Sequence, residues 1–286
     1  MGSGLFLGLT TVDILNYVDR YPGCNEKIRA RNQLIYAGGP AANGAVAYAA
    51  FGNTTQLFTG LGKQPLADLA KADLKTHGVE VADWAVDPQL LPVLSSIIVD
   101  ESSGDRSVVY TDTTDRKLGA ESVAKDTMEG SSVLLLDGFY LPQAIHLAGL
   151  AKETGIPVVF DGGSWKEGLE YLLPLVDYAI CSANFCPPGC SNKRDVVRFL
   201  RDIGIGSMAI SQGGGPLYAN KEGVEKDIAI EAVDVVDTLG AGDILHGAFC
   251  HFIQKSDFFD SLRYGAEIAT QSCRFKGTRS WIGEVV

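Results

Sequence analysis

Short apolar segments alternate with helical patterns along most of this 286-residue chain, and this alternation limits the possible folds more than any other feature. Runs such as LFLGL, SVLLLDG and IPVVFDGG are almost wholly apolar, which is typical of strands buried on both faces of a parallel sheet. Amphipathic segments that end in glycine, such as PLADLAKADLKTHG and LPQAIHLAGLAKETG, lie between them. The pattern predicts a three-layer α/β/α sandwich with a mostly parallel central sheet.

Two stretches, at about 13–36 and 92–112, break the alternation. NEKIRARNQLIY and VLSSIIVDESSGDRSVVYTD have strand-like patterns with no helix between neighbouring strands, and the second contains a turn at SSGD. We expect both to form a small antiparallel sheet inserted into a single domain of residues 1–286. Such a sheet either extends an edge of the main sheet or covers the ligand edge as a lid, and we favour the lid.

Charge and composition exclude several classes of partner. The net charge is −11 and the pI is about 4.8, which argues against nucleic acid or a membrane surface as a partner because both are anionic. The N-terminal segment lacks a basic region and contains Asp13, so we expect a buried strand and a cytoplasmic protein instead of a signal peptide. The scattered cysteines predict reduced thiols and no metal site, although Cys181, Cys186 and Cys190 cluster.

The string DTLGAGD, followed by an apolar helical segment, combines a small-residue turn with an acid at a helix start. Unpaired N–H groups at a helix N-terminus bind anions, and glycines allow a ligand close to the backbone. Asp243 beside a bound phosphate predicts a base that accepts the proton of an attacking hydroxyl. The alternative is a first-turn acid that only stabilises the helix dipole. We expect that dipole to lower the pKa of Asp243 and to make it a weak base.

DTLGAGD with its helix, and AGGPAANGAVAYAAFG at 37–52, resemble the two signatures of the ribokinase-like (PfkB) carbohydrate kinases, in the same order. VDTLGAGD, IIVDESSGDRSVVY and LRYGAEIATQSC are most similar to the ketohexokinases and fructokinases of that family. The resemblance covers nearly the whole chain and is weakest from about 114 to 205. It implies a ribokinase-like fold with a small β-sheet lid. It also implies ATP-dependent transfer of the γ-phosphoryl group to a hydroxyl of a small sugar, such as fructose or ribose.

The resemblance also assigns roles to individual residues. The catalytic group is the base Asp243 with an anion hole at Gly240, Ala241 and Gly242. The sugar-binding residues are Asp13, Gly39, Asn43 and Arg106. The nucleotide-binding residues are Gly213, Gly214, Gly215, Lys166 and Thr238. Carboxylates and amides at the ends of rigid elements suit sugar hydroxyls, each of which donates and accepts. Plain alternatives are a turn acid for Asp13, a solvated hairpin charge for Arg106 and a surface lysine for Lys166.

The implied cofactors are ATP and Mg²⁺, with a monovalent cation such as K⁺ as an option. Many members of the family carry an Asn-x-x-Glu motif that organises magnesium-bound water, whereas this chain has Asn184 and no Glu three residues later. Ketohexokinase has a sugar-binding Asn where this chain has Pro40, and an Asp where it has Asn25. The first change removes a hydrogen-bond donor from the sugar pocket and the second removes a charge, which argues against fructose in particular. The basic segment 273–280 either shapes the adenine or cation side of the site or is solvated.

Two other functions remain open at this point. A nucleoside kinase of the same fold would need an apolar slot for a base, and a non-catalytic sugar- or nucleotide-binding regulator would have no use for Asp243. A dinucleotide-binding dehydrogenase fits poorly, because no GxGxxG turn follows the first strand.

We expect His246 to be a packed helix residue. We also expect a homodimer through an apolar face of the small sheet formed by Ile28, Leu34, Val93, Ile97, Val99 and Val108.

Overall fold

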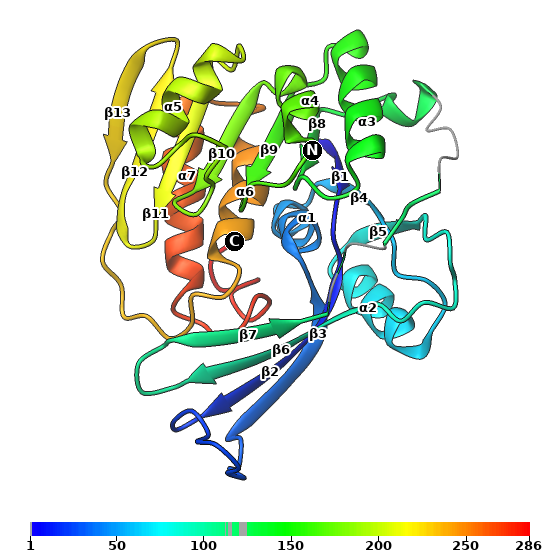
Figure 1. Ribbon diagram of the computed structural model, residues 1–286, viewed down its shortest axis with the longest axis vertical. Coiled ribbons are helices and arrows are strands. Elements are labelled where there is room, and N and C mark those ends of the chain that lie inside the picture. The colour runs from blue at the N-terminus through cyan, green and yellow to red at the C-terminus, as the bar shows by residue number, and fades with distance from the viewer. Residues whose placement is uncertain (1, 112, 114–115, 120–124) are drawn as a thin grey trace.

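A large, mostly parallel sheet forms the centre of the protein, as the computed structural model in Figure 1 shows; the model describes residues 2–111, 113, 116–119 and 125–286. From one edge to the other its strands are β13 (Val224–Ile228), β12 (Gly215–Lys221), β11 (Ser207–Gln212), β10 (Tyr178–Ser182), β9 (Val158–Gly162), β8 (Val133–Leu136), β1 (Ser3–Leu7), β4 (Thr54–Thr59) and β5 (Val79–Asp83). All neighbours pair in parallel except β11 with β12 and β12 with β13. The parallel sheet predicted from the apolar runs is confirmed.

Helices cover both faces of this sheet. One face carries α1 (Pro40–Ala50), α2 (Pro65–Thr76), α6 (Ala241–Phe252) and α7 (Phe258–Ser272). The other carries α3 (Leu141–Thr154), α4 (Leu169–Leu172) and α5 (Lys193–Asp202), with short 3₁₀ turns at Lys125–Met128 and Leu173–Leu175. Strand β8 shows why its sequence is apolar throughout: Val133 and Leu135 join the first core, whereas Leu134 and Leu136 join the second. Within the described residues, no helix is long and apolar enough to span a bilayer.

A second sheet lies across the ends of the main strands, in the lower part of Figure 1. Its strand order is β3 (Asn32–Gly38), β2 (Thr11–Val18), β6 (Val93–Asp100) and β7 (Arg106–Tyr110), and we call it the small sheet. The predicted segments are therefore present, but residues 25–31 are outside any strand. The expectation of a wholly antiparallel sheet is wrong, because β2 pairs with β6 in parallel. These two strands are far apart in sequence, and alternation alone does not fix the direction in which such strands pair.

The apolar face of the small sheet faces the body of the same chain. Ile97 and Val99 are almost wholly buried and pack with Leu15, Tyr17 and Tyr36. Leu239, from the loop before α6, packs against this cluster. Val93 is also buried, so three of the six residues in the face that we expected to join two copies are already covered, whereas Val108 is 44% exposed. The opposite face carries the exposed side chains of Ile35 (45%) and Val109 (73%).

Two short connections join the small sheet to the main domain. Residues 8–10 link β1 to β2, and Gly39 alone links β3 to α1. Gly39 has φ = +96°, and a Cβ there would lie 2.3 Å from the carbonyl oxygen of Leu9. Any larger residue would therefore disturb both connections at once.

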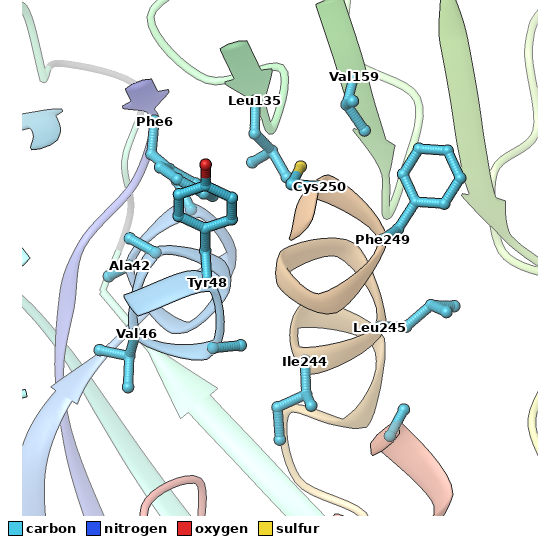
Figure 2. Close-up of a cluster of buried hydrophobic side chains, with 14 of the residues drawn as sticks. Phe6, Ala42, Val46, Tyr48, Leu135, Val159, Ile244, Leu245, Phe249 and Cys250 are labelled. Carbon is cyan, nitrogen blue, oxygen red and sulfur yellow. The ribbon is translucent and has the colours of Figure 1, made fainter. Parts of the chain in front are cut away.

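Helices α1 and α6 pack closely beneath the strands, and Figure 2 shows their side chains meeting those of β1 and β8. Small residues permit this contact. A Cβ on Gly247 would lie 2.2 Å from the carbonyl oxygen of Gly44 and 2.6 Å from the Cβ of Ala47. The two helices therefore approach backbone to backbone, and this contact brings together the two motifs that are about 200 residues apart in the sequence.

Candidate active site

A cleft of about 490 Å³ lies between the small sheet and the carboxyl ends of the main strands. Its polar lining includes the predicted residues Asp13, Gly39, Asn43, Lys166 and Asp243, together with Thr11, Ser95, Asp137 and Asp161. Its apolar lining includes Leu9, Ile97, Val108, Tyr110, Phe139 and Leu239. Residues from β2, β6, β9, α1 and α6 therefore converge on one space, as expected where parallel strands end.

Asp243 lies in the first turn of α6 and contacts the first signature directly. The side-chain amide of Asn43 donates to Oδ2 of Asp243 at 2.8 Å. Gly240 caps the helix with φ = +71°, and a Cβ there would lie 2.5 Å from the Cγ2 of Thr278. A residue with a side chain at position 240 would therefore both strain the turn and displace the C-terminal segment.

Two of the three amides predicted to bind an anion at this helix start, those of Gly240 and Gly242, are free of backbone partners among the described residues, whereas that of Ala241 is bonded. The amide of Ala241 donates to the carbonyl of Thr238 at 3.3 Å, and the first bond of the helix runs from Ile244 to Gly240. Within the described part of the chain, the amides of Gly240, Gly242 and Asp243 make no backbone hydrogen bond. Space above Gly242 is open, since no atom lies within 4 Å of a Cβ built there. This geometry suits an anion.

The pKa of Asp243 is shifted in the direction opposite to our expectation. Burial raises its pKa well above the ordinary value, and the charge of Asp161 raises it further, whereas the Asn43 hydrogen bond and His246 lower it. The lowering effect of the helix dipole on this pKa is outweighed, because the Asp243 carboxyl is removed from water and lies near the charge of Asp161. The sequence could not show this, since Asp161 lies on β9 and meets Asp243 only in the fold. A raised pKa makes Asp243 a stronger base when it is ionised.

The carboxylates of Asp137 and Asp13 also line the cleft, and each occupies space that a side chain on a nearby glycine would fill. Asp137 accepts hydrogen bonds from the backbone amides of Leu9 (2.8 Å), Phe139 (3.0 Å) and Ala41 (3.2 Å). A Cβ on Gly8 would lie 2.1 Å from this carboxylate, and one on Gly38 would lie 1.9 Å from that of Asp13. Burial raises the pKa of Asp137 to about 6 and also raises the pKa of Asp13.

Other predicted residues lie elsewhere in or around the site. Lys166, predicted to contact the nucleotide, lies in the same cleft as Asp13 and Asp243. Its ammonium group donates to the carbonyl of Asp137 at 3.3 Å and lies 4.3 Å from the centre of the Phe139 ring. Arg106 does not line the cleft; its guanidinium donates to the hydroxyl of Thr238, in the loop before α6. These contacts place Arg106 at the loop before α6 and Lys166 in the cleft that Asp13 and Asp243 line.

In the glycine run 213–215, Gly213 and Gly214 form the turn between β11 and β12 and Gly215 begins β12, outside the cleft. Gly213 has φ = +60°, and a Cβ on Gly213 or Gly214 would meet no atom within 4 Å. The turn follows the carboxyl end of β11, at the same edge as the ends of β9 and β10. A ligand lying along that edge from α6 would therefore pass this open backbone.

His246 is packed inside the protein, as predicted, but its imidazole also contacts the carboxylate of Asp161. Its Nδ1 lies 2.6 Å from the carbonyl oxygen of Gly242 and 3.4 Å from Oδ2 of Asp161, and its Nε2 lies 2.9 Å from the carbonyl oxygen of Ile180. The imidazole thus joins α6 to β9 and β10 directly behind Asp243.

Asp137 and Asp237 had no role assigned from the sequence, and Arg279 lay in a basic segment of open function. Asp137 was detectable, because it follows a buried strand in the string VLLLDG. Asp237 accepts bonds from the hydroxyl of Tyr17 (2.6 Å) and the amides of Leu239 (2.9 Å) and Gly277 (3.0 Å). It therefore ties the small sheet to the loop before α6 and to the C-terminal segment.

Metal-binding groups are absent from the described ranges: no three His, Cys, Asp or Glu side chains are arranged to hold an ion. Cys181 is buried, whereas Cys186 is exposed and its thiol donates to the carbonyl of Cys190 at 3.1 Å. Asn184 is exposed in the loop after β10, with a proline at position 187.

Comparisons with known proteins point to one family. The profile described as "pfkB family carbohydrate kinase" matches residues 3–282. The deoxyribokinase of Salmonella typhi is 25% identical, over 96% of this chain and 93% of that protein. The ketohexokinase of Mus musculus is 23% identical, over 96% of each chain. The structure of Arabidopsis thaliana ribokinase complexed with ribose and ATP superposes with a TM-score of 0.74 and 20% identity, covering 96% of this chain and 93% of that one.

Proposed function

Since the chain belongs to the pfkB family of carbohydrate kinases, which are phosphotransferases with a hydroxyl acceptor, we propose that it transfers the γ-phosphoryl group of ATP to a small neutral sugar of the fructose or ribose kind. The observation that carries this proposal is the position of Asp243. It faces the cleft at a helix start with free amides and is bonded to Asn43 of the other signature. The Arabidopsis ribokinase, which was solved with ribose and ATP bound, supports the same pair of substrates.

In the proposed reaction, a sugar hydroxyl lies between Asp243 and the γ-phosphorus. The hydroxyl oxygen forms a bond to phosphorus as the bond from phosphorus to the β-phosphate oxygen breaks, which releases ADP. The hydroxyl proton passes to the carboxylate of Asp243. The amides of Gly242 and Asp243 donate to the phosphoryl oxygens, where negative charge is spread in the transition state. Mg²⁺ bound to the ATP phosphates would neutralise part of that charge.

The charge of the cleft favours a sugar without a phosphate group. Among the residues that the structure describes, four aspartates line it, Asp13, Asp137, Asp161 and Asp243, and Lys166 is the one cationic side chain. Carboxylates accept hydrogen bonds from hydroxyls but repel an anionic substituent. The apolar wall that includes Ile97 and Phe139 suits the carbon face of a sugar.

A panel of phosphoryl acceptors tests the proposed function. We expect ATP turnover to be highest with neutral pentoses or hexoses and at least about tenfold lower, as kcat/KM, with their phosphates, because the acidic cleft disfavours a second anion. Purified Asp243→Asn protein in the same assay measures background turnover. A preference for nucleosides would establish the nucleoside-kinase alternative. Tight sugar binding without any ATP turnover would instead support a regulator.

The acidity of Asp243 gives an expected pH dependence. Protonated Asp243 cannot accept the hydroxyl proton, so kcat should fall as the pH drops through its raised pKa. The acid limb should lie well above the ordinary aspartate value of about 4. Initial rates at saturating sugar and ATP, over the pH range in which the protein stays folded, measure it. A kcat that stays constant down to about pH 5 would contradict the assignment.

We also propose that the protein is a homodimer through the outer face of the small sheet, in place of the covered inner face. This outer face carries Ile14, Ile35, Ile98 and Val109, of which Ile35 and Val109 are exposed. Exposed apolar side chains on one face of a sheet favour a protein contact. Light scattering that gives the mass of one chain at assay concentration would refute the dimer.

A further inference from the structure

The guanidinium group of Arg279 is largely shielded from solvent and contacts Asn43, the partner of Asp243. Its side chain is 9% exposed, although the basic segment around it suggested a solvated tail as one option. It donates to Oδ1 of Asn43 at 2.9 Å, to the carbonyl oxygen of Ala37 at 2.6 Å and to Oδ2 of Asp73 at 3.1 Å. Arg279 therefore connects the C-terminal segment to β3, α1 and α2.

The contact with Arg279 fixes the orientation of the Asn43 amide. Arginine can only donate hydrogen bonds, so the oxygen of the Asn43 amide must face it. The NH₂ group of Asn43 then faces Oδ2 of Asp243, at 2.8 Å. If the amide were reversed, two oxygens would face one another, and the carboxylate would lose its side-chain donor. Asn43 is only 4% exposed, so water has little access to replace either bond.

Asp73 holds Arg279 in this position. It lies on α2, and its carboxylate also accepts from the amide of Ala37 at 3.2 Å. Burial acts to raise the pKa of Asp73, but a hydrogen bond from His77 and the charge of Arg279 lower it, so that it stays ionised. The guanidinium carbon also lies 5.1 Å from the centre of the Tyr36 ring. Two anchors therefore keep the guanidinium from moving away from Asn43.

We propose that Arg279 is a positioning residue that acts through Asn43. It keeps the Asn43 amide donating to Oδ2 of Asp243, so that Oδ1 of Asp243 is left for the sugar hydroxyl. This inference rests on the proposed role of Asp243 as the base. Arg279 touches neither substrate in this arrangement, and its contribution is the geometry of the pair Asn43–Asp243.

The test compares Arg279→Met with Arg274→Met. Arg274 lies in the same segment, but it is exposed and bonds only to Gln271, at 3.2 Å, among the described contacts. We expect Arg279→Met to lower kcat by about tenfold to 100-fold, with the KM for ATP unchanged, whereas Arg274→Met stays near wild type. The acid limb of kcat should move to higher pH, because Asp243 loses a donor. The other charged groups that act on Asp243, namely Asp13, Asp161 and His246, remain.

A double-mutant cycle shows whether Arg279 acts through Asn43. In an Asn43→Ala background, Arg279→Met should cause little further loss of kcat at saturating sugar, since the amide to be oriented is gone. If Arg279→Met does not fold, Arg279→Lys replaces it: lysine keeps a charge near Asp73 but lacks the planar fork that reaches both partners. The inference would be overturned if Arg279→Met lowered kcat equally in the wild-type and Asn43→Ala backgrounds. It would also be overturned if the Arg279 variants kept the wild-type kcat and the wild-type acid limb of its pH profile. Asp243→Asn separates the two proposals, because an active Asp243→Asn protein refutes the base itself.

Discussion

Replacing Asp243 with asparagine should lower kcat by roughly 10²–10⁴-fold while the protein still binds its sugar. Asparagine has nearly the same shape and keeps the first turn of α6, so the free amides of Gly242 and residue 243 remain. It cannot accept the hydroxyl proton. Steady-state kinetics with saturating ATP, together with calorimetric titration of the sugar, measure both effects.

The same variant should be more stable than the wild type at neutral pH. The pKa of Asp243 is raised in the folded protein, so its contribution to stability is complete below the unfolded pKa of about 4 and is lost as the pH rises through the folded pKa. At neutral pH the ionised carboxylate is therefore unfavourable beside Asp161. We expect the free energy of unfolding of Asp243→Asn to exceed that of the wild type by on the order of 1 kcal/mol, and the gap to close toward pH 4.

Asp234→Asn is the matched control for both measurements. Asp234 is an exposed residue in the loop that precedes α6, so the same chemical change should leave the rate and the stability close to wild type. An Asp243→Asn protein with near-wild-type turnover would show that another group accepts the proton. A loss of stability at neutral pH would show that the carboxylate is better compensated than its burial indicates.

The second large effect is expected from Gly247→Ala, which should lower the free energy of unfolding by about 2–3 kcal/mol and reduce kcat. The added methyl group would lie 2.2 Å from the carbonyl oxygen of Gly44, so α1 and α6 must move apart. That movement also separates Asn43 from Asp243. Asn43 is the residue before Gly44, and Asp243 lies about one helical turn before Gly247. Chemical denaturation and initial rates test the two consequences separately.

Gly149→Ala provides a control of opposite sign. Gly149 also lies inside a helix, α3, but a Cβ there would meet no atom within 4 Å. Alanine is a better helix former than glycine by roughly 1 kcal/mol, so this substitution should stabilise the protein and leave its rate unchanged. If Gly247→Ala also stabilises, the contact between α1 and α6 is looser than the structure indicates.

The sequence predicted well those features that depend on local pattern. The parallel sheet follows from apolar runs, and helices α1 and α6 follow from small-residue and glycine-acid motifs. Asp13, Gly39, Asn43 and Asp243 were assigned by resemblance and do share one cleft. The pairing of β2 with β6 was not predictable, because two alternating segments can align in either direction.

The properties that the sequence missed arise from contacts between distant segments. The sign of the Asp243 pKa shift depends on burial and on Asp161, which lies 82 residues earlier, as the two residue numbers show. Arg279 belongs to a short basic segment, and nothing in that segment distinguishes it from Arg274. Its position behind Asn43 requires the C-terminal segment to cross the start of α1, and that crossing is a property of the whole fold.

The short connections between the small sheet and the main domain have a mechanical consequence. Asp13 belongs to β2 in the small sheet, whereas Asp243 belongs to α6 in the main domain. Besides residues 8–10 and Gly39, side-chain contacts such as the hydrogen bond from Tyr17 to Asp237 hold the two parts together. A molecule bonded to both aspartates would add one more link across the cleft, so its binding should resist separation of the small sheet from the main domain.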